Sequence, residues 1–132
     1  MQIRRTKLNS VFTEQATNAV SDALNVRDYD FMILQIGTAA STDGKLQVRG
    51  SAGSAVNLGA AQSPTNIWDY QYLFDLNTGT GITGTTGVSP AGAITKEYKV
   101  NVDGLQKIAI EITGRTAGNY TVNLYGVTIN GH

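Results

Sequence analysis

The last third of the chain, residues 96–129, alternates apolar and polar residues over runs of strand length. Glycine-containing turns, Asp103-Gly104 and the segment 114–119, separate these runs. Three sets of residues share the apolar parity: Tyr98, Val100 and Val102; Ile108, Ile110 and Ile112; Tyr120, Val122 and Leu124. Alternation with a period of two predicts β-strands that each bury one face and expose the other.

Two earlier segments also have strand patterns. Residues 29–38 are apolar almost throughout, which predicts a central strand buried on both faces. Residues 45–49 alternate, which predicts a neighbouring strand with one face in water. That strand directs two residues inward, Leu46 and Val48, and three outward, Lys45, Gln47 and Arg49.

A third segment, residues 67–76, carries aromatic side chains at every second position. Aromatic residues favour strands, and their shared parity predicts that they face the core. The set is Trp68, Tyr70, Tyr72, Phe74 and Leu76. The alternative is an exposed platform that stacks against sugar rings, for which Trp68 would have to be exposed.

Length and composition fit one layered β domain. The chain has 132 residues, 41% of them apolar and 15% charged, and no long amphipathic segment separates the predicted strands. If each strand buries one face, the strands must pack as two sheets. We therefore predict a single-domain, antiparallel, jelly-roll-like β-sandwich with an extended N-terminal arm. We assign residues 1–18 to the arm and residues 19–132 to the sandwich.

The N-terminal arm is basic. Arg4, Arg5 and Lys7 lie within the first seven positions, and the first acidic residue is Glu14. We expect an extended arm that enters a strand, with a short helix capped by Thr13 as the alternative. Such a charge cluster is either a solvated tail or a latch onto an acidic neighbour.

The segment 77–92 holds five glycines and only two large apolar residues, Ile82 and Val88. A loop of this length in a compact domain is either a flexible connector or a segment held by a partner. A phosphate-binding loop is excluded, because no Gly-Lys-Ser/Thr ending or following helix is present.

Residues suited to catalysis are scarce. The chain has no cysteine, and its one histidine is the terminal His132. Asp69 and Asp75 are too far apart on an extended strand for paired carboxylate chemistry, and the acids at 28, 30 and 43 are more typical of turns than of a calcium site. We therefore expect no enzymatic activity, no cofactor and no metal site.

Charge and hydropathy exclude two further classes. The formal net charge is zero, which argues against a general nucleic-acid binder. No apolar stretch approaches the roughly 20 residues of a membrane span, and the N-terminus lacks the apolar core of a secretory signal. We expect neither nucleic acid nor membrane as a partner.

Four segments together resemble the head decoration, or cement, proteins of tailed bacteriophages. They are residues 21–26, 29–36, 46–51 and 98–129, and the resemblance extends over roughly residues 20 to 130. Tail, baseplate and head-fibre β-domains show a similar pattern.

The resemblance implies a role without catalytic residues. A protein of this kind would stabilise the capsid by bridging major capsid subunits, as a homo-oligomer, with a trimer favoured. It would be assembled in the host cytoplasm and lie on the capsid exterior. A tail or fibre domain that binds a host-surface glycan is the alternative. The residues expected to contact partners are Gln2, Arg4, Arg5, Lys7, Ile82 and Val88.

Overall fold

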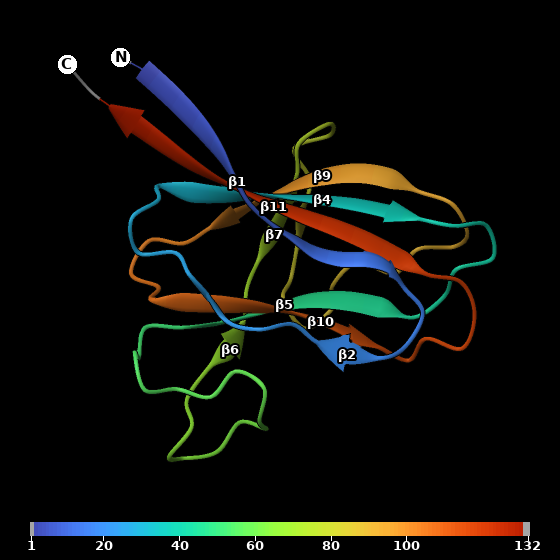
Figure 1. The fold of residues 1–132 in the computed structure, drawn as a ribbon, viewed down its shortest axis with the longest axis horizontal. Coiled ribbons are helices and arrows are strands. Elements are labelled where there is room, and N and C mark those ends of the chain that lie inside the picture. Colours follow the sequence, from blue (N-terminus) through green and yellow to red (C-terminus); the bar gives the residue numbers. More distant parts are fainter. Residues whose placement is uncertain (1, 131–132) are drawn as a thin grey trace.

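The computed structural model describes residues 2–130, which form eleven β-strands joined by turns and loops. Figure 1 shows the strands stacked in two layers. In chain order they are β1 (Gln2–Gln15), β2 (Ala19–Val20), β3 (Leu24–Asn25), β4 (Phe31–Thr38), β5 (Lys45–Ser51), β6 (Asp69–Tyr70), β7 (Leu73–Asp75), β8 (Gly81–Ile82), β9 (Thr95–Asn101), β10 (Lys107–Thr113) and β11 (Tyr120–Asn130).

Two antiparallel sheets pack face to face. The six-stranded sheet has the order β1-β11-β4-β9-β7-β8, and the second sheet has the order β2-β10-β5-β6, with β3 also paired to β10. The connections from β4 to β5, from β9 to β10 and from β10 to β11 each cross between the sheets. The predicted all-β antiparallel sandwich is confirmed, and jelly-roll-like wiring stays a prediction. Across residues 2–130, no helix is long and apolar enough to span a membrane.

The core lies between the sheets and contains the residues predicted from alternation. All nine apolar residues of the three C-terminal runs are buried. They meet Met32, Leu34 and Ile36 of β4 and Leu46 and Val48 of β5 in one cluster. Fully burying a side chain of this size contributes about 1.5–3 kcal/mol, so this cluster is the main source of stability.

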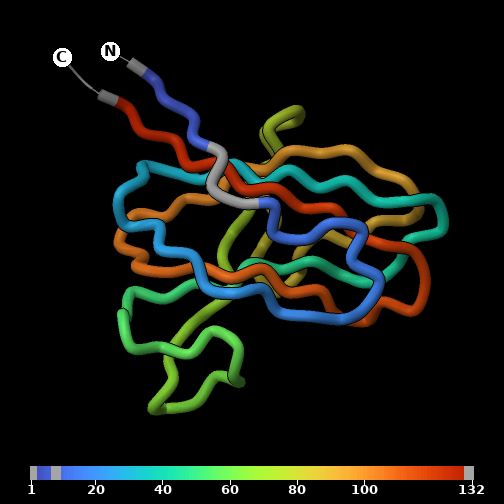
Figure 2. The backbone as a smooth tube through the Cα atoms, in the orientation of Figure 1, coloured from blue at the N-terminus to red at the C-terminus, as the bar shows by residue number. Residues whose placement is uncertain are grey.

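The N-terminal segment is extended and the alternative helix is not formed, but residues 2–15 are a strand of the sandwich rather than an arm outside it. β1 pairs antiparallel with β11 from Gln2↔Asn130 to Gln15↔Tyr120 and forms one edge of the six-stranded sheet. Phe12 on this strand is buried in the main core. Figure 2 shows the first residues of β1 and the last of β11 running side by side beyond the sandwich.

The outward face of β5 differs from the prediction, because it is covered rather than wet. Gln47 and Arg49 are buried. Gln47 Nε2 donates to the carbonyl of Gly84 at 3.0 Å, and Arg49 Nη1 donates to the carbonyl of Leu58 at 2.7 Å. Two loops therefore fold over this face, which local alternation does not reveal.

The aromatic segment also differs from the prediction. The expected continuous strand is split, because β6 pairs with β5 whereas β7 pairs with β9 in the other sheet. After this crossing Leu73 faces the core with 0% exposure, and Phe74 is 38% exposed. The parity predicted for Tyr72, Phe74 and Leu76 is thus wrong, and these three side chains lie at the surface.

Candidate binding face

The outward-facing side of the six-stranded sheet carries the largest group of exposed apolar side chains near a groove. Cross-strand register places Phe74, Lys99, Ile33 and Tyr125 in one row across β7, β9, β4 and β11. Partners in register share a face, and Ile36, Leu34 and Met32 on the alternate positions of β4 face the core. This row therefore lies on the side of the sheet that faces away from the core.

We call the exposed residues of β7 and its flanks, Tyr72, Phe74 and Leu76, the aromatic edge. Their exposed fractions are 46%, 38% and 46%. The rings of Tyr72 and Phe74 lie 5.0 Å apart between centroids and are tilted by 47°. In the next strands, Lys99 Nζ lies 4.7 Å from the centroid of the Phe31 ring. The face thus combines two aromatic rings in contact with a cation on the neighbouring strands, which suits a partner that is both apolar and polar.

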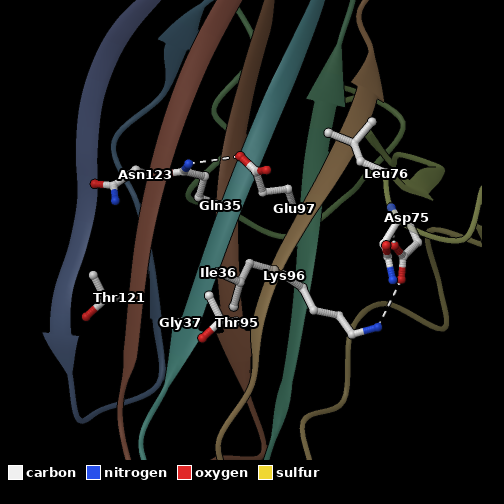
Figure 3. Close-up of a pocket in the computed structure, with 11 residues that line it drawn as sticks. Gln35, Ile36, Gly37, Asp75, Leu76, Thr95, Lys96, Glu97, Thr121 and Asn123 are labelled. Atoms are coloured by element: carbon white, nitrogen blue, oxygen red, sulfur yellow. Dashed lines mark hydrogen bonds and ion pairs between the residues drawn. The ribbon is translucent and has the colours of Figure 1, made fainter.

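A groove of about 710 Å³ borders the aromatic edge. It is lined by polar side chains of β4, β9 and β11, with Gln35, Glu97 and Asn123 among them, and by Asp75, Leu76 and Lys96 (Figure 3). Gln35 Nε2 donates to Glu97 Oε2 at 2.9 Å, so these two side chains hold each other in place. The groove presents amide and carboxylate groups in fixed positions at the surface.

Asp75 and Lys96 close one end of the groove as an ion pair. Lys96 Nζ lies 3.0 Å from Asp75 Oδ2, and the N–H of Asn77 donates to Asp75 Oδ1 at 2.8 Å. The hydrogen bond from Lys96 is the main cause that lowers the pKa of Asp75, and Asp75 in turn raises the pKa of Lys96. Because the Lys96 side chain is 41% exposed, solvent screens the pair and its contribution to stability is small.

A second candidate contact surface is the terminal ribbon, which we define as residues 2–4 with residues 128–130. β4 begins at Phe31, opposite Val127, so these last pairs of β1 and β11 extend past the third strand (Figure 1). Ile3 and Ile129 are opposite one another and are 63% and 40% exposed. A two-stranded ribbon is marginally stable in water by itself, so an apolar tip here favours a contact.

The predicted contact residues separate into three groups. Arg4 and Arg5 are exposed on β1. Gln2 and Lys7 lie on the same strand, but their side chains are outside the part that the structure describes. Val88 is buried, pairs with Leu46, and is a member of the main core, while Ile82 is partly buried against that core.

The loop 77–92 is therefore held by its own chain rather than left for a partner. Lys45 Nζ donates to the carbonyl of Thr85 at 3.1 Å, and Leu46 and Val88 exchange two backbone hydrogen bonds of 2.8 Å. Ile82 and Val88 therefore stabilise the fold. The aromatic edge lies beside this loop and stays exposed. Sequence alternation could not find this edge, because Trp68 and Phe74 share a parity that faces away from the main core in both sheets, and only Trp68 is covered by a second apolar cluster.

The acids considered for chemistry have structural partners. Asp30 Oδ2 accepts the N–H of Ile129 at 2.5 Å. Asp43 accepts the N–H groups of Thr116 and Ala117 at 2.8 and 2.9 Å and a bond from the Thr116 hydroxyl, and these bonds lower its pKa to about 2. Within residues 2–130, no group of three His, Cys, Asp or Glu side chains is placed to hold a metal ion. His132 lies outside the described residues.

Trp68 is 5% exposed and belongs to a second apolar cluster with Leu58 and Ala109. Its Nε1 donates to the carbonyl of Ala60 at 3.0 Å, and the Arg49 guanidinium lies 4.3 Å from its ring centroid. The predicted burial of Trp68 is confirmed, although it lies on the outer side of the second sheet. A sugar platform built on Trp68 is not formed.

No family model and no curated protein matches this chain. Among solved structures, it is similar to the SPBc2 prophage-derived protein YomS, with a TM-score of 0.65. The match covers 97% of this chain and 96% of that one, at 11% sequence identity. The likeness extends over nearly the whole length of both chains, and at this identity it concerns the fold alone.

Proposed function

We propose that this protein is a non-enzymatic structural protein of a tailed bacteriophage virion. In this proposal it decorates the capsid exterior and stabilises the shell by bridging major capsid subunits, as a homo-oligomer with a trimer favoured. It is assembled in the host cytoplasm and needs no cofactor. The observation that carries the proposal is the end-to-end fold similarity to a prophage-derived protein.

Two features of the surface support a role in protein contacts. The terminal ribbon and the aromatic edge both expose large apolar side chains, which are typical of interaction surfaces.

The carboxylates of Asp30, Asp43 and Asp75 are bound by backbone N–H groups or by a lysine. These acids therefore serve turns and strand ends, in accord with a role that needs no catalysis.

The direct test adds the purified chain to phage particles that lack it and measures bound copies per particle. We expect saturable binding to the shell, seen as density that bridges capsid subunits by cryo-electron microscopy. The double variant Arg4→Glu/Arg5→Glu should bind weakly, and Lys107→Glu, a charge reversal on β10 of the second sheet, should bind normally. Density confined to the tail or fibres would overturn the capsid assignment.

A second candidate function is binding of a host-surface glycan by a tail or fibre domain. The specific observation in its favour is the polar groove of Gln35, Glu97 and Asn123 beside the exposed Tyr72 and Phe74. Sugars are recognised by such pairing of aromatic rings with planar polar groups. An oligosaccharide array probed with the wild type and with Tyr72→Ala/Phe74→Ala tests it, and binding that the double variant retains would argue against this face.

A further inference from the structure

The two edges of the terminal ribbon differ. On the β11 side, the carboxylate of Asp30 accepts the N–H of Ile129 at 2.5 Å, which closes that edge. On the other side, β1 is the last strand of the sheet. Among residues 2–130 it pairs with β11 alone, so its outer edge is open. Register shifts interrupt β1 only after Lys7, so residues 2–7 form an edge without a bulge. A regular, unpaired edge is a template for a further strand.

The hydrogen bonds of β11 fix which groups of β1 point outward. The N–H of Ala39 donates to the carbonyl of Asn119, and the N–H of Asp30 donates to the carbonyl of Val127. Odd-numbered residues of β11 therefore direct their backbone groups toward β4, and even-numbered residues direct theirs toward β1. In an antiparallel pair, bonded and non-bonded positions alternate. Arg4, opposite Thr128, is thus bonded to β11, whereas Ile3 and Arg5 turn their N–H and C=O groups to the open edge.

The side chains along this edge define the chemistry of a matching strand. Ile3 and Ile129 form an exposed apolar pair at the tip, and Arg4 and Arg5 are exposed on opposite faces of β1. A second copy added antiparallel would bring arginines of both chains together, and like charges in paired strands are destabilising. An extended segment with an apolar residue opposite Ile3 and acids opposite Arg4 and Arg5 would be complementary.

We propose that the open edge of β1, through the backbone of Ile3 and Arg5, receives an acidic β-strand from a partner protein and becomes an internal strand of a seven-stranded sheet. Main-chain hydrogen bonds give such strand addition its affinity, and alternate side chains give its specificity. The added strand also supports the ribbon, which has no third strand of its own. The inference rests on the proposed function only in taking the partner to be a neighbouring virion subunit.

The test uses the full chain and a blocked synthetic peptide, Thr-Val-Glu-Glu-Val-Thr, which has the same sequence pattern in either strand direction. Amide resonances are followed by NMR as peptide is added. We expect the largest shifts and the strongest protection from hydrogen exchange at Ile3 and Arg5, and smaller changes at Arg4. The control peptide Thr-Val-Lys-Lys-Val-Thr should leave these amides unchanged. Unshifted Ile3 and Arg5 amides in excess acidic peptide would overturn the proposal.

Two variants at one position separate strand addition from charge attraction. Arg5→Ala removes the charge and keeps the N–H, whereas Arg5→Pro removes both, and proline is tolerated at an open strand edge. We expect Arg5→Pro to bind the peptide about tenfold more weakly than Arg5→Ala, because it loses a backbone hydrogen bond. Equal binding by the two variants would overturn the backbone mode. Unchanged core resonances, such as Val100, verify that each variant is folded, and Ile3→Pro repeats the comparison if Arg5→Pro is not.

The same experiment shows whether a second copy of this chain, rather than an acidic partner, pairs with the open edge of β1. If the Ile3 and Arg5 amides shift with protein concentration in the absence of peptide, β1 pairs with itself and the acidic partner is wrong. Because the peptide experiment uses the isolated chain, its failure leaves the capsid proposal intact. Conversely, absence of the protein from capsids would leave a positive peptide result intact.

Discussion

Asp43 connects the turn after β4 to the turn between β10 and β11. Its carboxylate accepts hydrogen bonds from the Thr116 hydroxyl and from the N–H groups of Ala117 and Thr116, and these bonds hold its pKa at about 2, below the ordinary value of 3.8. A depressed carboxyl pKa stabilises the fold at pH values above 3.8, and this contribution is lost as the pH falls through about 2.

Asp43→Ala should therefore unfold at lower denaturant than the wild type at pH 7, and the difference should shrink as the pH falls from about 4 to about 2. Denaturant titrations at a series of pH values measure it. Asp103→Ala, which removes an exposed carboxylate from the turn after β9, is the matched control, and at pH 7 it should unfold at the same denaturant concentration as the wild type. A difference for Asp43→Ala that stays constant down to pH 2 would contradict the assigned role.

The ion pair of Arg49 and Glu111 lies beneath the loop that covers the second sheet. Arg49 Nη2 lies 2.5 Å from Glu111 Oε2, with side-chain exposures of 10% and 7%, and the Tyr70 hydroxyl donates to Glu111 Oε1 at 2.7 Å. Glu111→Ala leaves a buried guanidinium without its counter-ion, and we expect a loss of about 3–5 kcal/mol. The double variant Arg49→Met/Glu111→Leu should recover much of that loss in denaturant titrations. A single variant as stable as the wild type would show that the pair is not buried.

At the scale of the element, β7 provides a direct comparison of two adjacent residues. Leu73 is fully buried and Phe74 is 38% exposed, the reverse of the parity that the aromatic spacing predicted. Leu73→Ala should cost about 2–5 kcal/mol of unfolding free energy. Phe74→Ala should cost no more than about 1 kcal/mol, from its contact with Tyr72. Thermal and denaturant unfolding measure both, and a larger loss for Phe74→Ala would restore the predicted parity.

At the scale of the whole molecule, β1 consists of two parts with different roles. Residues 2–4 belong to the terminal ribbon, whereas Phe12 is part of the main core. Deletion of residues 1–4 should lower Tm by no more than about 4 °C, the shift expected for about 1 kcal/mol. Deletion of residues 1–15 removes a core side chain and opens the edge of β11, so this variant should unfold or aggregate. Calorimetry and light scattering distinguish the two outcomes, and a longer deletion that stays folded and does not aggregate would show that β1 is dispensable.

The sequence by itself determined the strands at 98–102, 108–112 and 120–124, their buried parity, and the all-β sandwich that they imply. Period-two alternation reflects the pleat of each strand, which is a local property, so these residues were assigned correctly without knowledge of their neighbours. It also showed that the N-terminal segment is basic, and it favoured an extended conformation over a short helix without deciding between them.

Only the tertiary structure decided which surfaces remain exposed. The loop 77–92 and the segment after β5 cover Gln47 and Arg49. The segment after β5 also covers Trp68, whereas Tyr72 and Phe74 stay exposed after the chain crosses to the other sheet. Pairing of β1 with β11, and closure of the β11 edge by Asp30, join residues about 100 positions apart. Such features depend on long-range chain closure, and a pattern read from adjacent residues holds no information about which distant segment covers an edge or a face.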